Sequence, residues 1–125
     1  MPGEVKRAAR LAPRVAEHIA MLLGSKVKDP RLAAVTVTRV TMPDDLRSAK
    51  VLFRLLGSDE PAAREEALTG LRRAAGVLRK EIGHGLGLRY APELTFAFDD
   101  EPDAVQRIEE LLEEVKAEER GRKGR

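Results

Sequence analysis

The chain has 125 residues, the usual length for one domain built around a single hydrophobic core. It contains no cysteine, so disulfides, thiolate catalysis and cysteine-ligated zinc are excluded. No stretch approaches the roughly 20 apolar residues that span a bilayer, and the first residues lack the apolar core of a signal peptide. A cytoplasmic protein without a membrane partner is therefore expected.

Charge is distributed unevenly along the chain. Residues 1–99 hold 17 Lys and Arg against 12 Asp and Glu, whereas residues 100–119 hold nine acidic residues against two basic ones. A basic body suits a polyanionic partner, because Lys and Arg near phosphates release condensed counterions on binding. Blocks of charge are also typical of an ordinary solvated surface, so the pattern alone does not decide between the two.

The first elements expected in chain order are a helix and a β-hairpin. Residues 1–12 are expected to form a flexible basic extension, and the first helix is predicted to begin at Pro13, because proline is tolerated best in the first helical turn. Strands are predicted over residues 35–40 and 49–55, where β-branched and other apolar residues alternate with polar ones. A change in the apolar phase of the first strand predicts a β-bulge near Arg39.

The second half of the chain is predicted to form helices separated by one strand. A helix begins at about Pro61 and its pattern continues to Leu88, but five glycines interrupt it, so a kinked or broken pair of helices is expected. A third strand covers residues 94–98, and an acidic helix with an apolar stripe covers residues 100–119. Residues 120–125 are expected to be a disordered basic tail. The predicted fold is α+β, in the order α-β-β-α-kink-α-β-α, with a three-stranded sheet and the helices packed on one face.

Candidate catalytic or metal-binding residues do not form a recognisable constellation. His18 and His84 lie on different predicted helices, at no spacing that metal ligation favours. Asp44 and Asp45 fall in a predicted turn, where such residues more often accept hydrogen bonds from backbone N–H groups. No catalysis and no metal are therefore expected, and a small hydrolase or nuclease using Asp44, Asp45 or Glu93 is the enzymatic alternative.

Two glycine patterns are similar to nucleotide-binding loops but lack the required context. Residues 83–88 depart from G-x-G-x-x-G at the last position, and no strand precedes them. Residues 121–124 match the G-x-x-G of KH modules but have no helix after them. With three Phe and one Tyr, the chain also has few rings for RNA bases to stack on, which disfavours an RRM-type reader.

A basic face is predicted on the helix that follows the expected kink. Residues three, four and seven positions apart share one side of a helix, which groups Arg79, Lys80, Gly83, His84 and Gly87. Arg72 and Arg73 add positive charge just before the kink. Arginine and lysine supply charge for phosphate oxygens, and glycine permits close approach of another backbone. The face therefore predicts RNA binding, with an ordinary solvated helix surface as the alternative.

Several segments together resemble the bacterial ribosome-binding factor A family. They follow one another at the family's spacing over roughly residues 13–115, and they are residues 28–32 (KDPRL), 35–40 (VTVTRV), 42–51 (MPDDLRSAKV), 78–83 (LRKEIG) and 88–96 (LRYAPELTF). The resemblance implies a KH-like fold of type II over residues 13–99. In that family an interhelical kink of the form Ala-x-Gly replaces the G-x-x-G loop, and Ala74, Ala75 and Gly76 stand at that position.

The resemblance implies a non-catalytic assembly factor without a cofactor. Such a factor binds the small (30S) ribosomal subunit and its 16S rRNA late in maturation, and it supports processing of the 5′ end of the rRNA. The implied partners are the small subunit and 16S rRNA, with assembly GTPases as a further class, and the implied state is a monomer. The helix-face and family residues together give the expected RNA-binding set, which is Arg31, Arg47, Lys50, Arg72, Arg73, Arg79, Lys80, His84 and Arg89.

A protein-interaction module is the alternative that does not involve RNA. The predicted last helix carries an apolar stripe from Val105 to Val115, which is the pattern of a helix that docks in a groove. Binding to a partner that survives nuclease treatment would favour this alternative.

Overall fold

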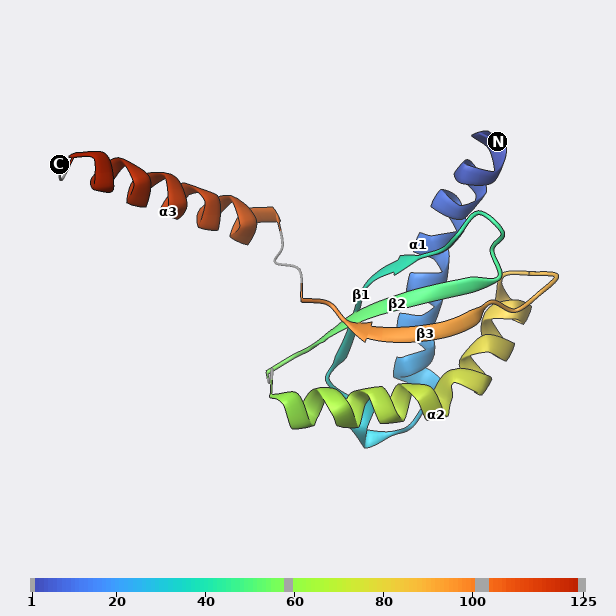
Figure 1. Ribbon diagram of the computed structural model, residues 1–125. Helices are drawn as coiled ribbons and strands as arrows, with labels where there is room; N and C mark the ends of the chain where they lie inside the picture. Colours follow the sequence, from blue (N-terminus) through green and yellow to red (C-terminus); the bar gives the residue numbers. More distant parts are fainter. Residues whose placement is uncertain (1, 58–59, 101–103, 124–125) are drawn as a thin grey trace.

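The computed structural model describes residues 2–57, 60–100 and 104–123, with side chains described in residues 7–57, 60–100 and 111–121. Within these ranges the order of elements is α1, η1, β1, β2, α2, β3 and α3, where η1 is a short 3₁₀ helix. Figure 1 shows α1 and α2 beside the sheet, and it shows α3 standing apart from the rest of the chain. Among the described residues, no helix combines the length and hydropathy that crossing a membrane requires.

Helix α1 spans Pro2–Ser25 and is longer than the sequence predicts. The expected start at Pro13, after a flexible extension, was wrong, because Pro13 lies inside the helix. A proline inside a helix costs about 3 kcal/mol, since it removes a hydrogen bond and crowds the preceding turn. Ala8 and Ala12 are nonetheless buried. Tertiary packing of the turns before Pro13 therefore offsets the local preference.

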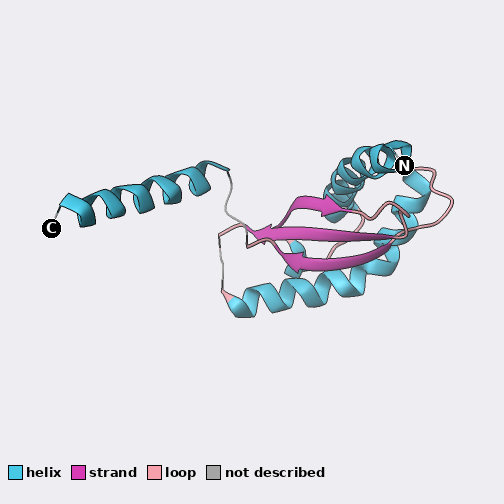
Figure 2. Cartoon of the chain, turned by 45° about the horizontal axis from the view of Figure 1, so that its top comes forward, coloured by secondary structure: helices cyan, strands magenta, loops and turns pink. Residues whose placement is uncertain are grey.

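The sheet contains β1 (Val35–Thr41), β2 (Ser48–Leu55) and β3 (Glu93–Phe98), with β2 in the centre. Strand β1 is antiparallel to β2, whereas β3 is parallel to β2, as the arrows in Figure 2 show. All three predicted strands are confirmed, each to within one residue at its ends. The parallel pairing requires a crossover between β2 and β3, and α2 provides it.

The predicted bulge in β1 is confirmed. The pairing of β1 with β2 shifts register between Val37 and Arg39, which leaves Thr38 as the extra residue. The Thr38 hydroxyl lies 3.2 Å from the carbonyl oxygen of Leu52 and 2.6 Å from a carboxylate oxygen of Asp99. These interactions fix the bulge, which allows apolar residues on both sides of it to face the helices.

The core lies between the sheet and the helices α1 and α2. Alternate residues of the central strand point into it, and Phe53 is fully buried and meets the Phe98 ring edge-on at a centroid distance of 5.7 Å. Both helices contribute large buried side chains to the same cluster, namely Val15, Ile19, Leu71, Leu78 and Ile82. A single core therefore joins α1, α2 and one face of the sheet, as expected.

Helix α2 spans Pro61–Gly85 and is continuous in its hydrogen bonding. A kinked or broken pair of helices was expected, and the structure contradicts the break, because one helix covers the whole segment. Glycine inside a helix costs only about 0.5–1 kcal/mol, and burial of Leu71, Leu78 and Ile82 along the same helix outweighs it. The expected change of direction is nevertheless present, since α2 bends about midway, where its colour passes from green to yellow (Figure 1). The assignment of that bend to Ala74, Ala75 and Gly76 stays a prediction.

Helix α3 spans Ala104–Lys123, so the tail expected to be disordered from residue 120 is helical through Lys123. Residues 101–103, where the acidic helix was expected to start, lie outside the described residues, and so do the side chains of Val105 and of the next residues in the predicted apolar stripe. The later part of that stripe is exposed, with Leu111, Leu112 and Val115 about half accessible to solvent.

Candidate nucleic-acid interface

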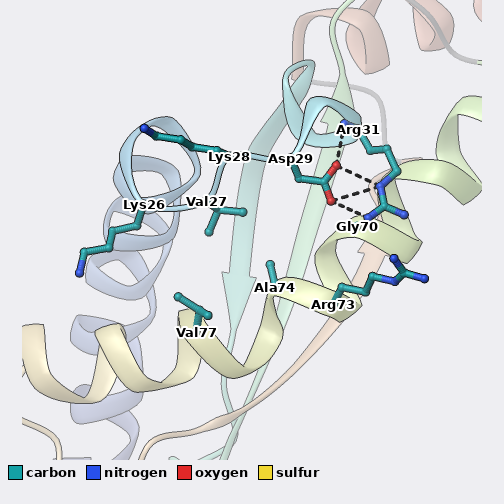
Figure 3. Close-up of a pocket in the computed structure, with 9 residues that line it drawn as sticks. All are labelled: Lys26, Val27, Lys28, Asp29, Arg31, Gly70, Arg73, Ala74 and Val77. Carbon is teal, nitrogen blue, oxygen red and sulfur yellow. Dashed lines mark hydrogen bonds and ion pairs between the residues drawn. The ribbon is translucent and has the colours of Figure 1, made fainter.

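A shallow basic pocket lies where η1 (Pro30–Leu32) meets the middle of α2 (Figure 3). Its volume is about 300 Å³, and four of its nine lining residues are basic while one is acidic. We call it the η1 pocket, and its lining residues are Lys26, Val27, Lys28, Asp29, Arg31, Gly70, Arg73, Ala74 and Val77. The segment after α1 and the helix α2 thus bring together positive charges that are about 45 residues apart in sequence.

Asp29 and Arg31 form one wall of the η1 pocket and are hydrogen-bonded to each other. The Asp29 carboxylate accepts a hydrogen bond from the backbone N–H of Arg31 at 3.0 Å, which caps η1. The Arg31 guanidinium donates to both carboxylate oxygens, with an Nη2–Oδ2 distance of 2.6 Å. The side-chain hydrogen bond from Arg31, followed by the backbone one, lowers the pKa of Asp29, and the side-chain hydrogen bond to Asp29 raises the pKa of Arg31. Much of the Arg31 charge is therefore neutralised within the chain.

The rest of the η1 pocket depends on a close approach of η1 to α2 at Gly70. A Cβ atom at Gly70 would lie 2.9 Å from Cδ2 of the buried Leu32 and 3.3 Å from Oδ2 of Asp29. Glycine at this position therefore avoids crowding and lets η1 pack directly on the helix. Gly76, by contrast, is exposed, and a Cβ atom there would meet no atom within 4 Å. The missing side chain of Gly76 leaves open surface that no packing among the described residues explains.

An exposed row of residues runs along α2 from the η1 pocket towards the C-terminal end of the helix. Arg73, Val77, Lys80 and His84 are separated by four, three and four positions, so they lie on one side of the helix. All four are exposed, and Gly76 borders them. We call these five residues the α2 stripe. Its two pocket-lining members, Arg73 and Val77, join it to the η1 pocket.

The far end of the α2 stripe borders a second shallow pocket of about 230 Å³. Lys80 and His84 line it together with Gly83, Leu88 and Ala91. Only some residues of the predicted basic face therefore lie together on the exposed side of α2. Lys80 and His84 share it as expected, whereas Gly83 lies against the Ala91 side chain and is partly covered.

Arg79 has a different environment from the one that the sequence predicted. Its Nε donates to the carbonyl oxygen of Pro92 at 3.1 Å, and its Nη2 donates to the carbonyl oxygen of Ala91 at 3.2 Å. The side chain therefore fastens the loop before β3 to α2. These hydrogen bonds give Arg79 a structural role, and its contact with RNA stays a prediction.

Replacing Arg79 with alanine is expected to destabilise the chain by about 1 kcal/mol, because two carbonyl oxygens lose a charged hydrogen-bond donor at a partly exposed site. Urea unfolding measures the change. The neighbouring Lys80→Ala substitution is the matched control, since the described residues offer Lys80 no hydrogen bond or ion pair, and it should alter the unfolding free energy by less than about 0.5 kcal/mol. Equal stability of the two variants would contradict the structural role of Arg79.

The remaining predicted residues lie on other surfaces. Arg72 is exposed, but it precedes Arg73 by one position and so points to another side of α2. Lys50 lies on β2 between Ala49 and Val51, which face the core, so its side chain lies on the sheet face away from the helices. Arg47 and Arg89 lie together in a third pocket, which also contains Arg7, Asp45 and Tyr90.

Lys26 and Lys28 were absent from the predicted set, although both line the η1 pocket. They flank Val27 just before the turn that leads into η1. This basic pair beside a capped turn is the feature of the sequence from which the two lysines could have been predicted as part of the interface. Lys26 also forms an ion pair with Glu81 of α2 at 3.3 Å. The pair ties the end of α1 to α2 beside the η1 pocket.

The structure places the residues considered for catalysis at two sites, the histidines near the end of α2 and the carboxylates near the start of β2. Within the described part of the chain, no group of three or more His, Cys, Asp or Glu residues is arranged to hold a metal ion. Asp45 accepts a hydrogen bond from the backbone N–H of Arg47 at 3.0 Å, as the turn prediction expected. His18 is partly buried, and its ring lies beside Gly85. Asp44 and Glu93 are exposed.

Comparisons with known proteins support the resemblance to the ribosome-binding factor A family. The family model described as Ribosome-binding factor A matches residues 7–112. Ribosome-binding factor A of Sorangium cellulosum is 49% identical over 117 residues, which cover 93% of this chain and 94% of the relative.

Solved structures give the same result for the fold. The crystal structure of ribosome-binding factor A from Thermus thermophilus is similar with a TM-score of 0.62 and 26% identity, over 72% of this chain and 93% of that one. A homology model of the Thermus thermophilus factor, as fitted into a cryo-electron microscopy map of its complex with 30S, is similar with a TM-score of 0.54 and 27% identity, over 77% of this chain and 96% of that one. The expected KH-like α+β fold is thereby confirmed.

Proposed function

The chain belongs to the ribosome-binding factor A family, and on this premise we propose that it binds the small ribosomal subunit through RNA. A member of the family was fitted into a map of a complex with 30S, which supports the same partner here. The observation that carries the proposal is the α2 stripe beside the η1 pocket, which four basic residues line together with one acidic residue that is already paired.

In the proposed interaction the RNA backbone lies along the α2 stripe. Arg73 and Lys80 bind phosphate oxygens, and His84 extends the interface towards the end of the helix. Gly76 has no side chain, so a sugar–phosphate chain can approach the helix backbone between these residues. The stripe contains no aromatic ring, and recognition by backbone and shape, in place of base stacking, follows from that.

We further propose that the chain acts on 16S rRNA late in assembly and supports processing of its 5′ end without catalysing it. Binding along a backbone can hold an RNA in one shape for another enzyme, and it requires no acid–base group on this chain. The family membership and the basic stripe support this role. The chain would act as a monomer in the cytoplasm, with assembly GTPases as a further partner class.

Sedimentation through a sucrose gradient tests the proposed function. The protein is expected to travel with free small subunits and not with complete ribosomes, and ribonuclease treatment should return it to the top of the gradient. Association that survives ribonuclease would instead favour a protein-interaction module. Equal association with complete ribosomes would contradict a role confined to assembly.

A further inference from the structure

A third pocket lies away from the α2 stripe and is built from three separate parts of the chain. The N-terminal half of α1 contributes Arg7, the loop between β1 and β2 contributes Arg47, and the loop after α2 contributes Arg89 and Tyr90. Its volume is about 340 Å³, and it is more enclosed than the η1 pocket and the pocket at Lys80. We call it the arginine pocket.

The charge of the arginine pocket is strongly positive and largely uncompensated. It contains three arginines against one acidic residue, Asp45. One oxygen of the Asp45 carboxylate is engaged by the backbone N–H of Arg47 in the turn. Within the described chain, the guanidinium groups of Arg7, Arg47 and Arg89 have no hydrogen bond or ion pair, and all three side chains are exposed. Guanidinium groups that line one pocket without ion-pair partners are suited to binding phosphate.

The arginine pocket also carries an exposed aromatic ring. Tyr90 is 69% exposed, although a tyrosine ring is a large apolar surface. The guanidinium carbon of Arg89 lies 5.5 Å from the centroid of the ring, and the partly buried side chains of Leu46 and Leu88 also line the pocket. An exposed ring next to arginines is the arrangement with which proteins bind unpaired nucleotides, because the base stacks on the ring and the backbone lies on the charges.

The loop between β1 and β2 is held in an unusual conformation at this pocket. Leu46 has a φ of 60°, in the left-handed region that residues other than glycine rarely adopt. The Leu46 N–H donates to the carbonyl oxygen of Pro43 at 3.0 Å, and the Asp45 side chain holds the Arg47 N–H, so the turn is fixed on both sides. Strain that the surrounding structure maintains in this way occurs preferentially at binding sites.

We propose that the arginine pocket binds an unpaired nucleotide of an RNA, with its base stacked on Tyr90 and its phosphates held by Arg7, Arg47 and Arg89. The inference rests on the proposed function only for the choice of RNA as the polymer, and the pocket is separate from the α2 stripe. An acidic peptide could satisfy the arginines, but it would not use the 69% exposed Tyr90 ring, so a nucleotide fits the pocket better.

The fluorescence of Tyr90 gives a direct test, because the chain contains one tyrosine and no tryptophan. The full chain is titrated with a short unpaired oligouridine, a blunt RNA duplex of similar charge and polyglutamate. Oligouridine is expected to quench the tyrosine emission, since stacking brings a base against the ring, whereas the duplex and polyglutamate should leave the emission nearly unchanged. Equal quenching by polyglutamate would show a general anion site and overturn the proposal.

Three variants separate this pocket from the α2 stripe. The Tyr90 variants lack the single tyrosine, so their binding is measured by the anisotropy of a labelled oligouridine. Tyr90→Ala should weaken this binding about tenfold, as the loss of one base stack does, while Tyr90→Phe should retain it. The Arg73→Glu/Lys80→Glu variant should bind oligouridine as the unaltered chain does. Unchanged binding by Tyr90→Ala would refute the nucleotide pocket without affecting the sedimentation result. Loss of co-sedimentation with oligouridine quenching intact would refute the proposed function alone.

Discussion

Replacing both Arg73 and Lys80 with glutamate is expected to weaken binding to isolated small ribosomal subunits about 100-fold. Each substitution removes a charged hydrogen bond to phosphate and adds repulsion, and about 1.4 kcal/mol for each residue corresponds to tenfold in affinity. Filter binding or fluorescence anisotropy with purified small subunits measures the change.

The two residues are suitable for this test because the substitutions should leave the fold intact. Both side chains are exposed, and the described residues give neither of them a hydrogen bond or an ion pair. The variant Arg14→Glu/Arg120→Glu changes the net charge equally at exposed positions on α1 and α3 and serves as the control. If the affinity fell equally in both double variants, net charge and not the α2 stripe would explain the binding.

Substitution of two glycines of α2 by alanine is expected to have different effects on stability. Gly76→Ala should stabilise the chain by about 0.5–1 kcal/mol, because alanine is the better helix former and its Cβ atom meets no neighbour. Gly70→Ala has the same helical gain but forces a methyl group against Leu32 and Asp29. Overpacking of this kind costs about 1–3 kcal/mol, so Gly70→Ala should be less stable than Gly76→Ala by that amount.

The Gly76→Ala variant also tests the proposed approach of RNA at this residue. It is expected to weaken small-subunit binding several-fold while raising the midpoint of urea unfolding, because its methyl group occupies the surface that the RNA backbone approaches. Stability and binding would then change in opposite directions at one residue. A Gly76→Ala variant that is more stable and binds with unchanged affinity would remove Gly76 from the interface.

The strands could be predicted from the sequence because their signals are local. Alternation over residues 35–40 and the change of phase at Arg39 were enough to predict β1 and its bulge. The start of α1 could not be predicted, since the penalty at Pro13 is a local property whereas the burial of Ala8 and Ala12 depends on the completed fold. The continuity of α2 was missed for the same reason, because buried leucines outweigh the glycines.

The candidate interface was predictable only where one element carries it. Helical spacing placed Lys80 and His84 on one face, and the structure adds Arg73 to that face. The role of Arg79 depends on carbonyl groups 12 and 13 residues away in sequence, which no helical pattern reveals. Arg7 and Tyr90 were missed because their pocket assembles from three distant segments.

The salt dependence of small-subunit binding tests the role of the α2 stripe most directly. The logarithm of the binding constant should fall linearly with the logarithm of the salt concentration. The Arg73→Glu/Lys80→Glu variant should have a slope smaller by about 0.9 for each phosphate that the chain no longer neutralises on duplex-like RNA. A variant with the same slope and the same affinity as the unaltered chain would show that RNA does not lie along α2.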